Sequence, residues 1–205
     1  MADIALPYFL AQPAGQGPWP GVVVIHEANG ISTQLLRFCQ RLAAEGFLAI
    51  APDLFFRVGG TEAAEYIDLV SAMKPEEAQA DLEASGRLLR ELRATRVGIT
   101  GFCMGGGLAY RMAVQTESFD AAVGFYGSSI ANELGTPNCP TLLFFGGKDV
   151  WIPSENIEKV AAHHRDTIVY PGAGHGFMRD RSEDFAEADA ADAWDRLLKW
   201  FHSEL

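Results

Sequence analysis

The sequence predicts an α/β fold, in which helices cover both faces of a mostly parallel central sheet in three layers. Apolar runs suited to strands alternate with amphipathic stretches suited to helices along nearly the whole chain. Three of the runs, residues 22–25, 97–100 and 142–145, are almost continuously apolar, which is typical of parallel strands buried on both faces. The 205 residues contain no internal repeat, low-complexity tract or linker, so we expect one domain over residues 1–205.

Local signals justify the elements of the first half. An edge strand is expected at residues 4–10, although Pro7 interrupts it, and Pro20-Gly21 introduces a central strand at 22–26. Ser32 or Thr33 can cap a helix that ends before Gly46. The next elements are a strand at 47–51, a loop at 52–60, a helix near 62–73 and a longer helix from Pro75 to about residue 93.

The second half continues the alternation. Strands are expected at residues 96–100, 120–126, 140–145 and 167–170, and helices at residues 104–116, 154–164 and 182–201. The last helix has large apolar side chains at helical spacing, from Phe185 to Phe201.

Composition excludes several classes of partner. The net charge of −11 argues against nucleic acid and anionic membrane surfaces, although a few local arginines can still bind an anionic small molecule. No apolar run reaches the ~18 residues of a membrane span, and the first residues lack the basic region of a secretory signal. Three cysteines without CxxC spacing suggest a reducing compartment. We therefore expect a cytoplasmic protein, and a monomer.

Cys103 stands in the most informative segment of the chain. It follows a predicted strand, precedes a predicted helix and lies between Gly101 and Gly105. A strand, a glycine-flanked nucleophile and a helix describe a nucleophile elbow, with cysteine where serine is usual. Such a turn lifts the sulfur into a pocket and points the first free N–H groups of the helix at whatever the sulfur attacks.

Other reactive side chains follow other strands of the predicted sheet. Glu27 follows the first central strand, Asp149 follows the strand at 140–145, and His175 follows the last strand. Ligands of parallel sheets bind beyond the carboxyl ends of the strands, where these residues would meet. The chain order Cys103, Asp149, His175 is the nucleophile, acid and base order of an α/β-hydrolase.

Five ordered sequence blocks resemble the dienelactone hydrolase family of the α/β-hydrolase fold. They are His26-Glu27, Ala51-Pro52-Asp53-Leu54, Gly101-Phe102-Cys103-Met104-Gly105-Gly106, Phe145-Gly146-Gly147-Lys148-Asp149 and Gly174-His175-Gly176-Phe177. The resemblance implies an enzyme (carboxymethylenebutenolidase type) that opens small lactones or esters, anionic ones among them, through a Cys-His-Asp triad. It implies no metal and no organic cofactor.

The resemblance and general chemistry together assign roles to these residues. Cys103 would attack the carbonyl carbon as a thiolate and form a thioester, His175 would act as base and then as acid, and Asp149 would orient the imidazole. By analogy with the fold, the backbone N–H groups of Met104 and Ala28 would bind the oxyanion.

Four further residues are candidates for activation and for substrate binding. In the family a glutamate at the position of Glu27 lies near the cysteine; we expect it to keep the resting thiol protonated until substrate moves it. Arg179 matches a family arginine that binds the substrate carboxylate, and Arg57 and Tyr66 are further candidates. The family arginine one helical turn before Tyr66 is replaced by Glu62, which weakens the case for the usual dienelactone substrate.

Three alternatives compete with this hypothesis. A general carboxylesterase on the same scaffold would show no preference for anionic substrates. A non-catalytic ligand-binding protein of this fold would bind a small acid but hydrolyse no ester. A redox-sensing thiol protein ranks lowest, because no CxxC partner for Cys103 exists. Cys39 and Cys139 are expected to pack as small apolar residues.

Overall fold

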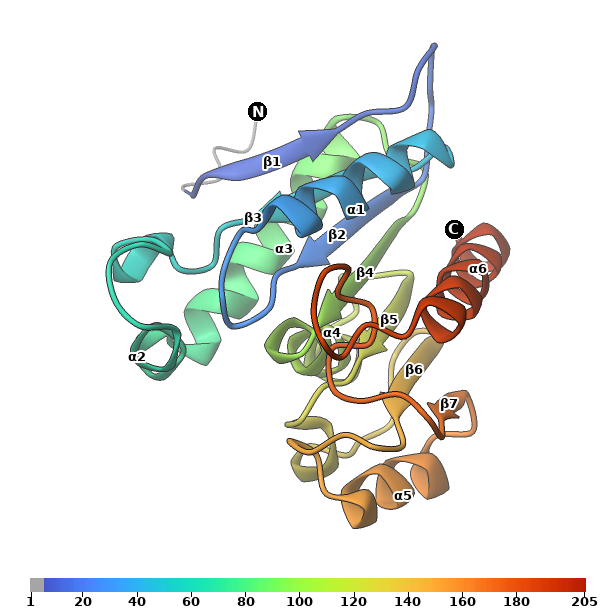
Figure 1. Ribbon diagram of the computed structural model, residues 1–205. Helices are drawn as coiled ribbons and strands as arrows, with labels where there is room; N and C mark the ends of the chain where they lie inside the picture. Colours follow the sequence, from blue (N-terminus) through green and yellow to red (C-terminus); the bar gives the residue numbers. More distant parts are fainter. Residues whose placement is uncertain (1–5) are drawn as a thin grey trace.

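The fold is built on one seven-stranded sheet with the order β1-β3-β2-β4-β5-β6-β7. A computed structural model describes residues 6–205. The strands are β1 (Tyr8–Ala11), β2 (Gly21–Ile25), β3 (Leu48–Pro52), β4 (Val97–Phe102), β5 (Ala121–Phe125), β6 (Thr141–Gly146) and β7 (Thr167–Tyr170). Only β1 is antiparallel, pairing with β3 at the edge, while the other pairs are parallel (Figure 1).

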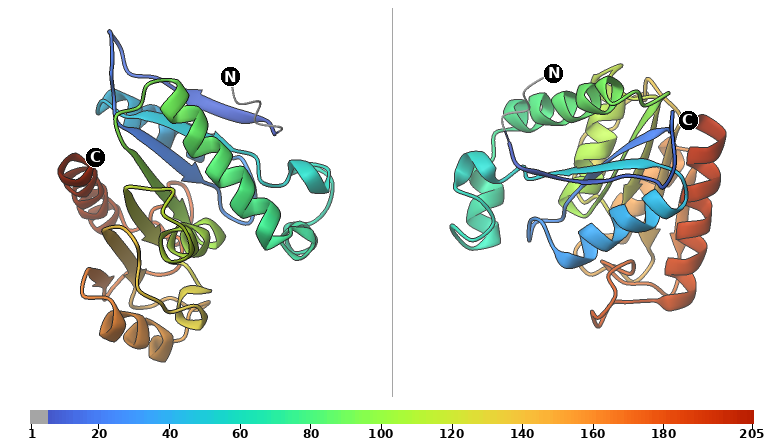
Figure 2. Two further views of the ribbon diagram at one scale, coloured as in Figure 1. Left: turned by 180° about the vertical axis from the view of Figure 1, so that it is seen from behind. Right: turned by 90° about the horizontal axis from the view of Figure 1, so that it is seen from above.

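Helices cover both faces of this sheet, as the sequence predicted. The α-helices are α1 (Thr33–Ala44), α2 (Tyr66–Ala72), α3 (Pro75–Glu91), α4 (Met104–Gln115), α5 (Ser154–His163) and α6 (Glu187–Glu204), with short 3-10 helices η1 (Phe56–Val58) and η2 (Ile130–Asn132). Figure 2 shows α1 and α6 on one face and α3 and α4 on the other. Among the described residues no helix is long and apolar enough to cross a bilayer.

The predicted boundaries are confirmed to within a few residues, with three differences at element ends. The predicted first strand begins at residue 4, outside the described residues; within them, Leu6 and Pro7 are not in a strand and β1 begins at Tyr8. Helix α2 begins at Tyr66 rather than near residue 62, because Gly59 and Gly60 adopt positive φ angles and turn the chain first. Helix α6 begins at Glu187 rather than at 182, because Arg181 adopts φ 66° and the chain folds back, with the Ala186 N–H donating to the Phe177 carbonyl.

A ladder of aromatic rings supports the carboxyl ends of the strands. Phe102 stacks on Phe125 at 4.9 Å between ring centroids, and Phe125 stacks on Phe144 at 4.8 Å, across β4, β5 and β6. Phe38 of α1 meets Phe102 edge to face, and all four rings are buried. Cross-strand aromatic pairs stabilise a sheet and fix its register. The ladder therefore sets the positions of the loops that leave these strand ends.

Candidate active site

Cys103 occupies the sharp turn between β4 and α4 that the sequence predicted. Its φ of 52° and ψ of −115° lie in a region that non-glycine residues rarely adopt. The turn needs small neighbours: a Cβ on Gly101 would collide with the carbonyl of Gly105, and a Cβ on Gly105 would lie 2.6 Å from the carbonyl oxygens of Ile25 and His26. The glycines thus allow β2 to approach α4 closely and leave the half-buried sulfur facing a cavity.

His175 and Asp149 form a hydrogen-bonded pair beside this sulfur. The His175 Nδ1 atom lies 2.8 Å from Oδ2 of Asp149, whose side chain is fully buried. The other carboxylate oxygen, Oδ1, accepts hydrogen bonds from the backbone N–H groups of Trp151 (2.8 Å) and Ile152 (3.0 Å). Both oxygens of Asp149 are therefore engaged, which fixes the plane of the carboxylate and, through it, the imidazole.

The environment of His175 favours its protonated form. Burial lowers the pKa of His175, but hydrogen bonds to Asp149 and Cys103 and the negative charges of both outweigh burial and raise the pKa to about 9. A histidine between a carboxylate and a thiol can hold the proton that the thiol gives up. The structure thus brings Cys103 and His175 together in the cavity lining, with buried Asp149 bonded to His175.

Glu27 lies on the same cavity and contacts two further side chains. Its Oε2 atom lies 3.2 Å from Nε of Arg179, and its Oε1 accepts a hydrogen bond of 3.3 Å from the Tyr126 hydroxyl. Tyr126 is buried, and burial, followed by the charge of Glu27, raises the pKa of its phenol well above the usual value, so the hydroxyl remains a donor. The Tyr126 ring also packs 5.0 Å from that of His175, between centroids.

His26 holds the backbone that carries Glu27. Its ring is completely buried, and burial lowers its pKa, so it is neutral near pH 7. Nε2 accepts a hydrogen bond of 3.1 Å from the Leu54 N–H, which leaves the proton on Nδ1 to be donated to the Glu27 carbonyl at 2.7 Å. His26 therefore ties the loop after β2 to the loop after β3.

A cavity of about 370 Å³ joins most of the predicted site residues. The residues that line it are Glu27, Ala28, Asn29, Tyr66, Cys103, Trp151, His175, Arg179 and Asp184. Met104 is the first residue of α4, where an N–H has no carbonyl partner within the helix. Arg57 does not line this cavity. It makes a two-point ion pair of 2.6 and 2.9 Å with Asp81, which is nearly buried in α3.

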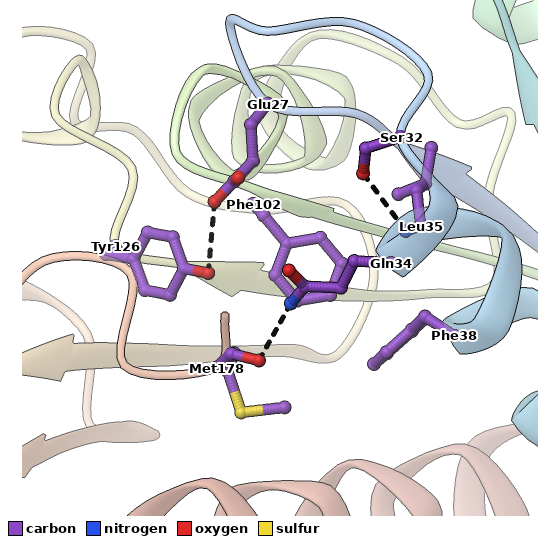
Figure 3. A pocket seen from close by; sticks show the side chains of 8 residues that line it. All are labelled: Glu27, Ser32, Gln34, Leu35, Phe38, Phe102, Tyr126 and Met178. Carbon is purple, nitrogen blue, oxygen red and sulfur yellow. Dashed lines mark hydrogen bonds between the residues drawn. The ribbon is translucent and has the colours of Figure 1, made fainter. Parts of the chain in front are cut away.

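A smaller cavity lies on the inner side of Glu27 (Figure 3). Its volume of about 20 Å³ is enough for roughly one water molecule. Figure 3 shows Gln34 bonded to the Met178 carbonyl across it and Tyr126 bonded to Glu27. Glu27 therefore separates the large, open cavity from a nearly filled interior.

Comparison with known proteins agrees with this geometry. The family model described as "Dienelactone hydrolase family" matches residues 6–205. The chain belongs to the dienelactone hydrolase family. A Salmonella typhimurium protein named "Putative carboxymethylenebutenolidase" is 35% identical over 96% of this chain and 82% of its own length.

Solved structures agree with the family and the fold. A Klebsiella pneumoniae structure described as a "Putative Dienelactone Hydrolase" is 32% identical, with a TM-score of 0.88 over 96% of this chain and 92% of that one. A dienelactone hydrolase-like promiscuous phosphotriesterase from metagenomic libraries is 24% identical, with a TM-score of 0.76 over 93% of this chain and 88% of that one, and shows the fold alone. The chain is thus a hydrolase of the dienelactone hydrolase type.

Sequence reasoning missed Tyr126 and His26 as parts of this dienelactone hydrolase-type site. Tyr126 follows β5 directly, so the rule that directs attention to the carboxyl ends of strands would have found it. His26 lies next to Glu27, but nothing in the sequence indicates that its ring turns inward to meet Leu54.

The His175–Asp149 pair predicts a defined pH dependence. In Asp149→Asn, burial persists without the carboxylate, so the pKa of the His175 imidazole should fall below its wild-type value of about 9. Because the folded-state pKa of His175 is raised, its contribution to stability is fully present below pH 6.5 and is lost as pH rises through about 9. The stability advantage of wild type over Asp149→Asn should therefore shrink across that window in urea unfolding. An NMR titration placing wild-type His175 at or below 6.5 contradicts this.

Proposed function

We propose that this protein hydrolyses small lactones or esters through Cys103, His175 and Asp149, with a thioester intermediate. The single observation that carries the proposal is the position of His175, which is hydrogen-bonded to buried Asp149 and lines, with Cys103, an open cavity of about 370 Å³. The family to which the chain belongs supports the same reaction class.

The reaction proceeds in two balanced steps. His175 takes the thiol proton, and the Cys103 thiolate attacks the carbonyl carbon. The tetrahedral intermediate then expels the leaving oxygen, which receives the proton from His175, and a thioester remains. In the second step His175 takes a proton from water as the water oxygen attacks the thioester. The carbon–sulfur bond breaks, the Cys103 sulfur receives the proton from His175, and the carboxylic acid leaves. A lactone therefore yields one hydroxy acid, and an ester yields an acid and an alcohol.

The backbone around Cys103 suits the charge that develops in both steps. The Cys103 N–H already donates to the Phe125 carbonyl at 3.0 Å, so the next N–H, that of Met104, is the first available donor of α4. Ala28 lines the cavity from the loop after β2, which adjoins the start of α4. Donors fixed in advance of the reaction stabilise the oxyanion without reorganisation, and each is typically worth ~10²–10³ in turnover.

Arg179 is the best candidate for binding a substrate carboxylate. It lines the cavity, whereas Arg57 is held by Asp81 outside it. A substrate carboxylate would compete with Glu27 for the Arg179 guanidinium, and a displaced Glu27 carboxylate would no longer oppose formation of the Cys103 thiolate, whose proton His175 takes. This follows the role that the family resemblance implies for Glu27.

The general carboxylesterase is the second candidate, and the charges around the cavity favour it. Arg179 is already paired with Glu27, and Asp184 adds a second carboxylate to the wall. Two carboxylates and one guanidinium attract a neutral ester as readily as an anionic lactone. A non-catalytic binding protein would need neither the strained turn at Cys103 nor the hydrogen-bonded His175–Asp149 pair.

We also propose that the protein is a cytoplasmic monomer of one domain. The described strands form one sheet, and the loops that leave it carry the proposed cavity residues. Cys39, Cys103 and Cys139 are free thiols, which suits a reducing compartment.

Cys103→Ala should lower kcat/KM for p-nitrophenyl acetate by at least ~10³-fold, because it removes the nucleophile. Rapid-quench mass spectrometry of wild type should show one acetyl group on the peptide that contains Cys103. Cys139→Ala removes a thiol far from the cavity and serves as the matched control. Wild-type turnover in Cys103→Ala would exclude the proposed nucleophile.

Arg179→Ala should lower kcat/KM for a carboxylated dienelactone by ~10–10²-fold, since a charged hydrogen bond is worth roughly 1.5–3 kcal/mol. Its effect on a neutral aryl ester should be small. Arg57→Ala should instead lower the free energy of unfolding, because Asp81 is left buried without its partner. If only Arg57→Ala changes the preference for the anionic substrate, the assignment of Arg179 is wrong.

Glu27→Gln should react faster than wild type with iodoacetamide and with hydrogen peroxide, because a carboxylate near Cys103 opposes formation of the thiolate. Glutamine still accepts the hydrogen bond from Tyr126, so the local fold should persist. Asp184→Asn removes another carboxylate of the same cavity wall and is the control. Equal inactivation rates for wild type and Glu27→Gln would remove this role.

A further inference from the structure

Trp151 is the largest exposed apolar side chain at the mouth of the cavity. It is 69% exposed, and the preceding Val150 is 87% exposed. Tryptophan is usually mostly buried, and exposed aromatic residues beside a cavity commonly mark a binding surface. The stability of the fold does not require this ring at the surface, so its position calls for a functional explanation.

The position of Trp151 is fixed by the same carboxylate that orients His175. The Trp151 N–H donates to Oδ1 of Asp149 at 2.8 Å, and Oδ2 of the same group bonds His175 at 2.8 Å. The indole and imidazole rings lie 6.5 Å apart between centroids, inclined at 58°. The backbone that carries the indole is therefore anchored to the carboxylate that orients His175.

The proposed reaction determines which part of the substrate lies beside Trp151. His175 must deliver its proton to the leaving oxygen, so the alcohol part of the ester lies on the His175 side of the sulfur. Trp151 borders that side, on the loop after β6, whereas Glu27 and Ala28 border the other side, on the loop after β2. A leaving group attached to the protonated oxygen would therefore extend over the indole.

We propose that Trp151 forms a subsite for a planar, aromatic or conjugated leaving group, and so makes the enzyme prefer aryl and enol esters over saturated alkyl esters. This inference rests on the proposed function and adds the class of alcohol that the site selects. A planar ring that covers the exposed indole removes apolar surface from water and gains the offset or edge contacts that aromatic pairs prefer.

The test compares two acetates whose leaving groups have nearly equal acidity but different shape. 4-Chlorophenyl acetate has an aromatic leaving group, and hexafluoroisopropyl acetate has a branched aliphatic one. Trp151→Ala should lower kcat/KM for the aryl ester by ~10-fold and change the fluoroalkyl ester by less than ~2-fold. Trp151→Phe, which keeps a ring, should retain most of the aryl activity.

Controls separate this inference from the proposed function. Tyr8→Ala removes another exposed aromatic side chain, at the far edge of the sheet, and should change neither rate. Equal losses for both esters in Trp151→Ala, with Cys103-dependent hydrolysis intact, would overturn the subsite alone. If hydrolysis instead survives in Cys103→Ala, the proposed function fails.

A binding measurement then decides the subsite without catalysis. Calorimetric titration of 4-chlorophenol into Cys103→Ala should give an affinity ~10-fold higher than titration into Cys103→Ala/Trp151→Ala. Equal affinities would overturn the subsite, whatever the rates show.

Discussion

The carboxylate of Asp149 is the group on which the arrangement of the site depends. One oxygen holds the imidazole of His175, and the other holds the backbone of the turn that carries Trp151 and Ile152. A fully buried carboxylate is costly unless every lone pair finds a donor, and here the donors are a histidine and two peptide groups. The orientation of the His175 ring and the backbone of the loop at the cavity mouth are thereby both set by a single carboxylate.

A second constraint acts at Cys103. Cys103 is held in an unfavourable conformation by the close approach of β2 to α4, which the neighbouring glycines permit. This approach also places the loop after β2, with Glu27 and Ala28, directly against the start of α4. The packing of β2 against α4 thus accounts for both the strain in the Cys103 turn and the formation of the cavity.

Much of this arrangement was predictable because parallel strands end at a common edge. The chain order of Cys103, Asp149 and His175, the glycines of the turn and the cap at Ser32 all appear as local patterns. The directions of long side chains do not appear in this way. Arg57 follows a strand as Asp149 does, yet it turns toward Asp81, more than twenty residues later, and nothing near it in sequence reveals this. The start of α6 was predicted too early for a similar reason. Apolar residues at helical spacing begin before the helix does, but there the chain folds back and the Ala186 N–H donates to the Phe177 carbonyl.

The pairing of Arg57 with Asp81 has a consequence for how such an enzyme can diversify. It attaches the segment after β3, outside the cavity, to α3, so that this segment cannot be remodelled without leaving a buried acid alone. The segment of residues 179–184 is instead a partly exposed run of turns outside any helix or strand. We therefore expect relatives that accept different substrates to differ first in the composition and length of residues 179–184. The Arg57–Asp81 ion pair should be retained.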